Sequence, residues 1–396
     1  MKWILNNKKN YEMQKSLLDE NTLVEVKSFH ESFSEYKPTP LVRLKKTSEY
    51  LGLSEIYIKD ESFRFGLNAF KVLGASYAIG KYLSRKFNKN FANLSMQMLK
   101  EGEWADVIKS ITLVSTTDGN HGRGVAWMAQ QLGCKAIIYM PKGSAQNRVN
   151  NIKQHGASVY VTEWNYDDTV RYTAKLAQEN GWEVIQDTAW EGYVDVPTWI
   201  MQGYSTIMQE VVIQLNGVTP THVFLQAGVG AFASIIADVL MTVYKSNPPK
   251  IVIVEPDKAD CFYRSAKAGK IIPVTGEMDT ISAGLACGEP NPIAWDILKD
   301  CTDMFIAAPD WMAARGMRIL GNPSGDDTRV ISGESGAITA GVLSVLMESN
   351  QFKAAKEALE LNEKSKVLLI STEGNTDPEI YRRIVWDGHY QSELNA

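Results

Sequence analysis

The sequence predicts an α/β fold in which mostly parallel sheets are covered by helices. Short apolar runs typical of buried strands alternate along the chain with segments whose apolar residues recur at helical spacing. This alternation is typical of β-α-β units, which place helices on both faces of a parallel sheet. Because no segment rich in Pro, Gly or Ser divides the 396 residues, we expect two α/β domains, if present, to be interwoven.

The predicted elements follow one another in a regular order. Strand-like runs cover residues 55–59, 111–115, 136–140, 158–162, 182–185, 221–225, 250–254 and 366–370, and helical patterns cover 69–85, 123–132, 167–180 and 204–214. The longest apolar stretch, 223–244, includes Gln226, Asp238 and a glycine cluster, so it predicts a strand, a turn and a helix rather than a membrane span. In open parallel sheets, ligands bind beyond the carboxyl ends of the strands, so the residues that follow each strand are the candidates for function.

The composition excludes several classes of protein. The net charge of -5 and the scattered lysines and arginines argue against nucleic acid or an anionic membrane as a partner. The N-terminal residues lack the apolar core and cleavage site of a signal peptide, so we expect a cytoplasmic protein. The four cysteines form no CxxC pair, so we expect buried reduced thiols and no metal site.

The first segment with unusual chemistry is GLNAFKVLGA, residues 66–75. Lys71 stands at the start of a predicted helix among apolar neighbours. The positive end of the helix dipole and the apolar setting both disfavour an ammonium, so we expect a lowered pKa, which suits an amine that forms a Schiff base. The alternative is a solvated lysine at a helix start, which is the usual case for a lone lysine.

The second segment is TTDGNHGRG, residues 116–124, between a strand and a helix. Its glycines let the backbone approach a ligand closely, and Asn120 offers a donor and an acceptor to a ring substituent. Asp118 would repel an anion, so its carboxylate is suited to chemistry or to a cationic substrate. The alternative for Asp118 is an Asx-turn or a helix N-cap.

The third segment is QAGVGA, residues 226–231, also between a strand and a helix. Its small residues expose successive backbone N–H groups at a helix start, which is a typical phosphate cradle. With Ala233 it also reads as GxGxxA, and Glu255 ends the next strand, so a dinucleotide site is an alternative. The spacing to Glu255 exceeds the usual value of about 20 residues, which weakens that alternative.

The fourth segment is STEGNT, residues 371–376, after the last predicted strand. A hydroxyl at a strand end can form a hydrogen bond with a ring nitrogen, and Ser371 and Thr372 both offer one. The alternative is an ordinary turn, because Ser, Thr, Gly and Asn are common turn residues.

The four segments together, in this order, resemble the fold type II pyridoxal-phosphate (PLP) enzymes, the class of tryptophan synthase β and threonine dehydratase. That resemblance implies that Lys71 carries the cofactor aldehyde and that Asn120 lies near the ring hydroxyl. It also implies that Gly228, Val229, Gly230 and Ala231 bind the phosphate. Thr372, with Ser371 as competitor, would face the pyridine nitrogen, and a neutral hydroxyl cannot hold that nitrogen protonated as an Asp would, which favours β-elimination over transamination.

Two departures from the dehydratase pattern narrow the resemblance. Ala69-Phe70-Lys71-Val72-Leu73 replaces the common Ser-Phe-Lys-x-Arg, and Asp118 replaces a small residue. Both are similar to the diaminopropionate ammonia-lyases of this family. Five further segments are similar to that group: residues 36–41, 139–146, 186–192, 283–291 and 332–337.

The resemblance implies a PLP-dependent α,β-elimination that converts 2,3-diaminopropionate to pyruvate and two ammonia molecules. Lys71 would act as base on one face of the substrate, and Asp118 on the other. Asp187, after the run 182–185, would join Asp118 and Thr117 in binding the diamino substrate and would assist release of the β-amino group. The alternative for Asp187 is a helix N-cap before residues 188–192.

The resemblance also implies a homodimer and a division into domains. Residues 35–85 and 195–385 would form the large PLP-binding domain, with 86–194 as a small domain inserted in it. Three other functions stay open: a serine or threonine dehydratase or β-replacement enzyme of the same fold, a nucleotide-linked oxidoreductase built on the Gly228 loop, and a regulatory protein without turnover. The dehydratase alternative is less suited to Asp118, because hydroxy amino acids present no second cation to it. The oxidoreductase alternative leaves Lys71 without a role. The presence of both Asp118 and Asp187 argues against a regulatory protein without turnover.

Overall fold

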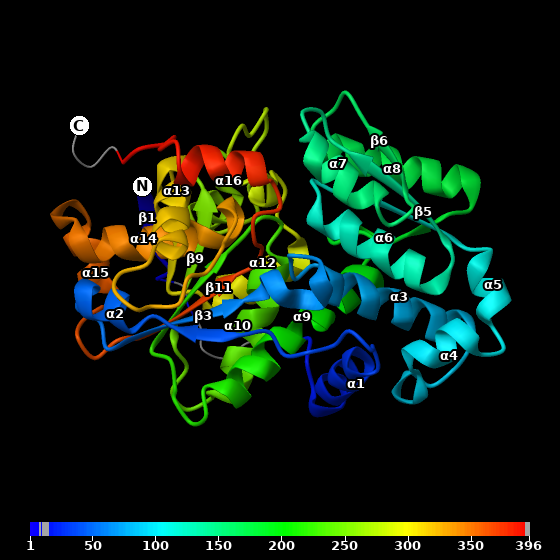
Figure 1. Cartoon of the computed structure of the whole chain (residues 1–396), viewed down its shortest axis with the longest axis horizontal. Coiled ribbons are helices and arrows are strands. Elements are labelled where there is room, and N and C mark those ends of the chain that lie inside the picture. The colour runs from blue at the N-terminus through cyan, green and yellow to red at the C-terminus, as the bar shows by residue number, and fades with distance from the viewer. Residues whose placement is uncertain (8, 10–15, 393–396) are drawn as a thin grey trace. The chain divides into compact units, whose positions relative to one another are not determined.

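The computed structural model describes residues 1–7, 9 and 16–392. The chain divides into two compact units, each an α/β layer structure as predicted (Figure 1). Unit 1 comprises Met1–Ser16, Thr39–Phe63 and Glu210–Ala396, and unit 2 comprises Leu17–Pro38 and Arg64–Gln209. The units are therefore interwoven in sequence, because neither is a single continuous segment.

Unit 1 is built on a seven-stranded sheet with the order β1-β10-β9-β8-β11-β3-β2. The strands are β1 (Lys2–Leu5), β2 (Leu41–Arg43), β3 (Glu55–Asp60), β8 (His222–Gln226), β9 (Lys250–Pro256), β10 (Met304–Ala308) and β11 (Lys366–Ser371). From β10 to β3 the strands run parallel, whereas β1 and β2 are antiparallel edge strands. Because the central strands are buried on both faces, they read in sequence as continuous apolar runs.

Helices surround this sheet (Figure 1). They are α2 (Lys45–Leu51), α10 (Ala231–Val243), α11 (Cys261–Ala268), α12 (Pro292–Cys301), α13 (Asp310–Gly321), α14 (Glu334–Glu348), α15 (Lys353–Ala358) and α16 (Pro378–Val385), with short 3-10 helices at Ala283–Leu285 and Asn350–Phe352. A further 3-10 segment, Glu61–Gly66, begins in unit 1 and ends in unit 2. The pair α13 and α14 packs with backbones nearly in contact, since a Cβ added at Gly341 would lie 1.8 Å from the Met312 carbonyl oxygen. Glycine at that crossing is therefore a packing requirement.

Unit 2 is built on a four-stranded parallel sheet with the order β6-β5-β4-β7. The strands are β4 (Thr112–Thr116), β5 (Lys135–Met140), β6 (Ser158–Val161) and β7 (Glu183–Val184). The helices are α1 (Glu20–Glu31), α3 (Val72–Lys86), α4 (Met96–Glu101), α5 (Ala105–Lys109), α6 (Asn120–Leu132), α7 (Gln146–Lys153), α8 (Tyr166–Asn180) and α9 (Asp195–Gln214), with a 3-10 turn at Phe91–Asn93. Figure 1 shows α6, α7 and α8 gathered around β5 and β6.

The predicted strands and helices are found with small shifts of their ends. The stretch 223–244 forms β8 and α10, as predicted, and no helix in the described residues is long and apolar enough to cross a membrane. One prediction was too short: the helix expected from residue 204 begins at Asp195, because Pro197 and Gly203 obscure its first turns. Three strands, β1, β2 and β10, were not predicted.

The predicted inserted segment, residues 86–194, lies within unit 2, but that unit is larger. It also contains α1, α3 and most of α9. The physical reason is a close packing of α3 against α9, since a Cβ added at Gly203 would lie 2.6 Å from the Leu73 carbonyl oxygen. The domain boundaries 35–85 plus 195–385 and 86–194 stay a prediction.

Candidate active site

Lys71 stands immediately before α3, as its N-cap residue, and is paired with a carboxylate. Its Nζ lies 2.5 Å from Asp187 Oδ2, and the Asp187 side chain is 3% exposed. The turn before the helix depends on Gly66 at φ 70° and Asn68 at φ 59°, in the left-handed region that Gly and Asn tolerate. The sequence placed Lys71 at a helix start correctly, but it gave no indication of this ion pair.

The charges around Lys71 decide its protonation. Burial alone would lower the pKa of Lys71, but the charge of Asp187, and more weakly those of Tyr204 and Asp118, raise it above its ordinary value. Burial likewise would raise the pKa of Asp187, but the charge of Lys71 holds it well below its usual range. The prediction of a lowered pKa for Lys71 is therefore wrong for the free amine, and both partners are charged.

Asp187 is also held by neutral donors. The Tyr166 hydroxyl donates to Asp187 Oδ1 at 3.1 Å, and the Gln186 amide donates to the same oxygen at 3.3 Å and to the Tyr166 oxygen at 2.8 Å. Residues 188–194 form a turn, and the next helix, α9, begins at Asp195. The N-cap alternative for Asp187 is therefore wrong, and its carboxylate faces Lys71.

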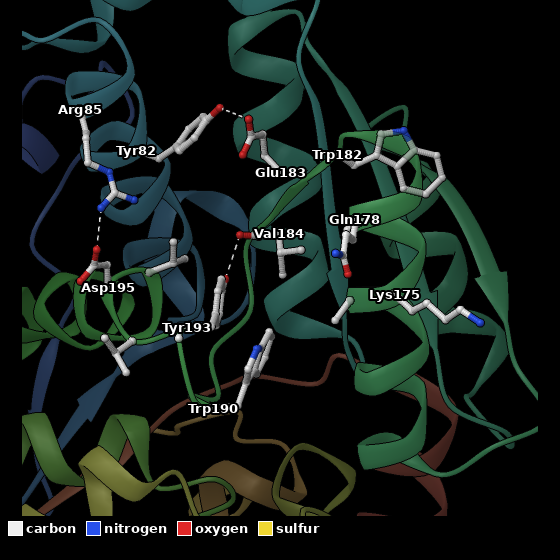
Figure 2. A pocket seen from close by; sticks show the side chains of 15 residues that line it. Tyr82, Arg85, Lys175, Gln178, Trp182, Glu183, Val184, Trp190, Tyr193 and Asp195 are labelled. Carbon is white, nitrogen blue, oxygen red and sulfur yellow. Dashed lines mark hydrogen bonds and ion pairs between the residues drawn. The ribbon is translucent and has the colours of Figure 1, made fainter.

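Tyr193 anchors the turn that carries Asp187. Its hydroxyl accepts from the Gln186 backbone N–H at 2.9 Å and donates to the Val184 carbonyl at 2.8 Å, while Trp190 stacks on its ring at 4.1 Å between centroids. Figure 2 shows Tyr193, Trp190 and Val184 among the side chains that line a pocket in unit 2, with the ion pair of Arg85 and Asp195 beside them. The volume of this pocket is about 640 Å³. None of the predicted site residues lines this pocket.

Asp118 lies in the turn between β4 and α6, and Asn120 is the first residue of α6. Gly119 is the N-cap of α6 and makes no side-chain cap bond. The capping acceptor is Thr117 Oγ1, which accepts from the backbone N–H groups of Gly119 at 2.9 Å and Gly122 at 3.0 Å. Asp118 is therefore not the N-cap of α6, whereas the buried Thr117 holds the turn in shape. The role of Thr117 in substrate binding stays a prediction.

His121 is the second residue of α6, and the sequence analysis gave it no role. Its ring is buried, and Nε2 lies 2.8 Å from the Ile185 carbonyl oxygen. A carbonyl only accepts, so Nε2 carries the hydrogen and Nδ1 carries a lone pair, which has no partner among the described residues. Burial lowers the pKa of His121, so the ring is neutral. In the sequence, the position of His121 directly after Asn120 is the only feature that could have pointed to a place in the site. We call Lys71, Asp118, Asn120, His121 and Asp187 the lysine group.

The glycine loop of unit 1 runs from the end of β8 at Gln226 to the start of α10 at Ala231. Gly230 adopts φ 89°, and a Cβ there would lie 2.3 Å from the Phe262 ring. A Cβ at Gly228 would lie 3.2 Å from the Gly284 carbonyl oxygen. The loop therefore requires small residues, and it presents backbone N–H groups at the N-terminus of a 13-residue helix, as expected for a phosphate site.

The hydroxyls at the end of β11 differ in their partners. Thr372 Oγ1 accepts from Gln226 Nε2 at 2.8 Å, whereas Ser371 Oγ donates to Ser332 Oγ at 2.8 Å. Both hydroxyl residues are buried. We call Gln226, Gly228, Val229, Gly230, Ala231 and Thr372 the phosphate-loop group. The structure thus collects the predicted site residues into two groups, the lysine group in unit 2 and the phosphate-loop group in unit 1.

The Glu255 side chain caps a helix, which contradicts the dinucleotide alternative, in which it would bind a ribose. Its carboxylate accepts from the backbone N–H groups of Phe262 at 2.8 Å and Tyr263 at 2.7 Å, at the start of α11. Burial raises the pKa of Glu255 to about 8. A carboxylate that caps a helix in this way is not available to a ribose hydroxyl.

The comparison with protein families defines the class. The family model described as pyridoxal-phosphate dependent enzyme matches residues 33–373. The chain therefore belongs to the PLP-dependent enzymes, with the fold type II architecture predicted from its motifs and PLP as its cofactor.

Within that family the relatives are specific. The chain is 54% identical over 366 residues to a diaminopropionate ammonia-lyase of Escherichia coli K12, covering 92% of this chain and 91% of the relative. A crystal structure of the E. coli diaminopropionate ammonia-lyase in complex with an aminoacrylate-PLP azomethine reaction intermediate matches with a TM-score of 0.92 and 50% identity, covering 98% of each chain. A catabolic L-threonine dehydratase of Staphylococcus aureus N315 is 26% identical and covers 81% of this chain and 83% of the relative.

Proposed function

We propose that this protein is a PLP-dependent ammonia-lyase that converts 2,3-diaminopropionate to pyruvate and two ammonia molecules. The observation that carries the proposal is the ion pair of the half-buried Lys71 with the buried Asp187, and the charge of Asp118 also raises the pKa of Lys71. Two carboxylates around the family lysine suit a substrate with two amino groups, and the similarity to diaminopropionate ammonia-lyases supports the same reading.

The residues present fit the cofactor. Gly228 to Ala231 would hold the phosphate on backbone N–H groups, in a loop where larger side chains would collide with Phe262 or Gly284. Thr372 would face the ring nitrogen, Asn120 the ring hydroxyl, and Lys71 the aldehyde. PLP bound in this way withdraws electrons from the α-carbon of the amino acid and so acidifies its α-proton.

The lysine group would move the protons. The Lys71 amine would take the α-proton from one face of the substrate, and Asp118 from the other. To take the α-proton, Lys71 must be a neutral amine, and Asp187 then keeps its neutral donors Tyr166 and Gln186 but faces no ammonium from Lys71. The β-ammonium of a diamino acid can take that place, and Asp187 would then orient it for departure as ammonia.

A hydroxy amino acid offers no such cation. Serine or threonine would leave the buried Asp187 carboxylate without a counter-charge, which is costly inside a protein. The dehydratase and β-replacement alternatives are therefore less suited to this site, and the lower identity to the threonine dehydratase agrees. The oxidoreductase alternative is excluded by the family and by the engagement of Glu255.

A substrate panel tests the proposal. Pyruvate and ammonia formation would be measured with the D- and L-isomers of 2,3-diaminopropionate, serine and threonine, using the PLP-loaded protein. We expect the diaminopropionate isomers to have the highest kcat/KM and to release two ammonia molecules for each pyruvate. A higher kcat/KM for serine or threonine would overturn the proposal in favour of a dehydratase.

We further propose that the protein is a cytoplasmic homodimer. The resemblance to the family supports the dimer, and the buried thiols of Cys261 and Cys301 suit a reducing compartment. Sedimentation equilibrium of the PLP-loaded protein tests the assembly. A mass equal to that of one chain across the concentration range would contradict it.

A further inference from the structure

The ends of two neighbouring strands bring an amide and a hydroxyl together in unit 1. β8 and β11 pair in parallel, with Leu369 opposite Phe224. Gln226 is the last residue of β8, and Thr372 directly follows β11. Both side chains are buried, at 2% and 4% exposure. The pairing therefore fixes a Gln–Thr contact beside the glycine loop.

The orientation of the Gln226 amide is determined by a carbonyl. Its Nε2 lies 2.9 Å from the Ile370 carbonyl oxygen and 2.8 Å from Thr372 Oγ1. Because a carbonyl oxygen only accepts, the atom that faces it must be the amide nitrogen. Nε2 thus uses one hydrogen on Ile370 and the other on Thr372, so the Thr372 oxygen must accept.

This contact uses one of the two acceptor positions of the Thr372 oxygen and leaves the hydroxyl hydrogen in need of an acceptor. A hydroxyl whose oxygen already accepts from Gln226 retains its hydrogen for another acceptor. Among the described residues, the bond from Gln226 is the hydrogen bond that the structure gives to Thr372 Oγ1. Ser371 differs, because its hydroxyl donates to Ser332 Oγ, and the Ser332 hydroxyl is in turn directed to the Gly333 carbonyl. The hydrogen of Ser371 is therefore already used.

We propose that Gln226 is a positioning residue that fixes the Thr372 hydroxyl as a hydrogen-bond donor to the ring nitrogen of PLP. The inference rests on the proposed function, in which Thr372 faces the ring nitrogen, and it explains why the Thr372 hydroxyl acts there as a donor. A hydroxyl held as a donor can bond only a ring nitrogen that has a lone pair, so it favours the unprotonated ring. The neutral state of the ring would then be set by the amide at the end of the neighbouring strand and would not depend on a titrating partner. It also assigns the ring nitrogen to Thr372 rather than Ser371.

The first test is a double-mutant cycle on cofactor affinity. Gln226→Met keeps the length of the side chain and removes its donor, and Thr372→Val keeps the shape and removes the hydroxyl. PLP dissociation constants would be measured by absorbance titration of the apoprotein. We expect Thr372→Val to weaken PLP binding roughly 3- to 10-fold, the range for one neutral hydrogen bond. Gln226→Met should weaken it less in the wild-type background and not further in the Thr372→Val background.

The second test reads the ring directly. With PLP labelled with ¹⁵N in the ring, we expect the wild-type nitrogen to keep the chemical shift of an unprotonated ring across the pH range in which the holoprotein is stable. In Gln226→Met the hydroxyl is free to turn and accept, so the ring should take up a proton at higher pH than in wild type. Ser371→Ala is the matched control and should leave the shift unchanged.

The outcomes separate the inference from the function on which it rests. An equal loss of PLP affinity from Gln226→Met in both backgrounds would show a purely structural residue and overturn the inference while leaving PLP chemistry intact. An unchanged ring shift in Gln226→Met would also overturn it. Failure of the wild-type protein to bind PLP would overturn the proposed function, and the inference with it.

Discussion

The lysine group and the phosphate-loop group differ in the physical means by which they are organised. The lysine group is organised by charge, because the half-buried Lys71 is paired with the buried Asp187 and each keeps the other ionised. The phosphate-loop group is organised by backbone geometry and neutral hydrogen bonds, as in the Gln226–Thr372 contact and the left-handed Gly230. The lysine group is therefore sensitive to pH and to the loss of either charged partner, whereas the phosphate-loop group is sensitive to the size and shape of its side chains.

This difference matches two different tasks, proton transfer in the lysine group and binding of the cofactor in the phosphate-loop group. Proton transfer and recognition of a second amino group need charged side chains close to the reacting atoms. Holding a cofactor in one orientation needs donors that do not change state with pH, and backbone N–H groups, an amide and a hydroxyl meet that need. Substitutions in the lysine group should therefore change rates and specificity, whereas substitutions in the phosphate-loop group should change cofactor affinity.

The largest effect is expected from removing the lysine. Lys71→Ala should lower pyruvate formation by roughly 10⁴–10⁶, the scale found when a covalent catalytic residue is removed. In the wild-type protein, borohydride should fix PLP to Lys71, and peptide mapping would locate the label. The buried Lys59, which is paired with Glu210, serves as the control lysine and should carry none. A label on any lysine other than Lys71 would contradict the assignment of Lys71 as the residue that binds PLP.

The next effect concerns the two faces of the substrate. The α-protons of the D- and L-isomers lie on opposite faces, and one base reaches only one face well, since proton transfer needs heavy atoms about 2.6–3.2 Å apart. Asp118→Asn keeps the size of the side chain and removes the base, so we expect a loss of roughly 10²–10⁴ in kcat for one isomer. The other isomer should be partly spared through Lys71.

Steady-state kinetics of both isomers in wild type and Asp118→Asn provide the measurement. Equal losses for the two isomers would assign Asp118 to binding of the second ammonium. Unchanged kinetics would mean that Asp118 has no part in the reaction.

A smaller effect is expected for substrate choice. Asp187→Asn removes the carboxylate that would pair with the β-ammonium, so the KM for 2,3-diaminopropionate should rise roughly 10- to 100-fold, as for the loss of a charged hydrogen bond. Any turnover of serine should change far less, because serine offers no cation. Tyr166→Phe is a graded control, since it removes one donor to Asp187 and leaves the charge. A parallel loss for both substrates would restrict Asp187 to the ion pair with Lys71.

The sequence was sufficient for the sheets because their strands are buried apolar runs. It missed β10 and the edge strands β1 and β2, and the edge strands exist only through their pairing with β10 and β3. The start of α9 was missed because Pro197 and Gly203 lower local helix propensity, which packing against α3 overrides.

The sequence also placed Lys71, Asp118 and Asp187 on the correct elements, but not their electrostatics. The sign of the pKa shift of Lys71 depends on Asp187, which is 116 residues away and meets it only in the folded unit. Gln226 and His121 were missed for a related reason. A glutamine at a strand end or a histidine after an asparagine has no distinctive pattern, and its role appears only when its partner is known.

The smallest effect concerns stability without cofactor and tests whether the lysine group is organised by charge. The folded state raises the pKa of Lys71, so this group stabilises the apoprotein fully below its unfolded pKa of about 10.4 and loses that contribution as pH rises further. The folded state lowers the pKa of Asp187, so its contribution is present above about 3.9 and is lost as pH falls below that value.

Urea unfolding midpoints of the wild-type apoprotein and of Lys71→Met combined with Asp187→Asn would be compared across pH. We expect the difference between the two proteins to be constant in the neutral range and to change at both ends, because only the wild type has the titrating pair. A difference independent of pH down to the acid limit would mean that the pair is not ionised in the folded apoprotein.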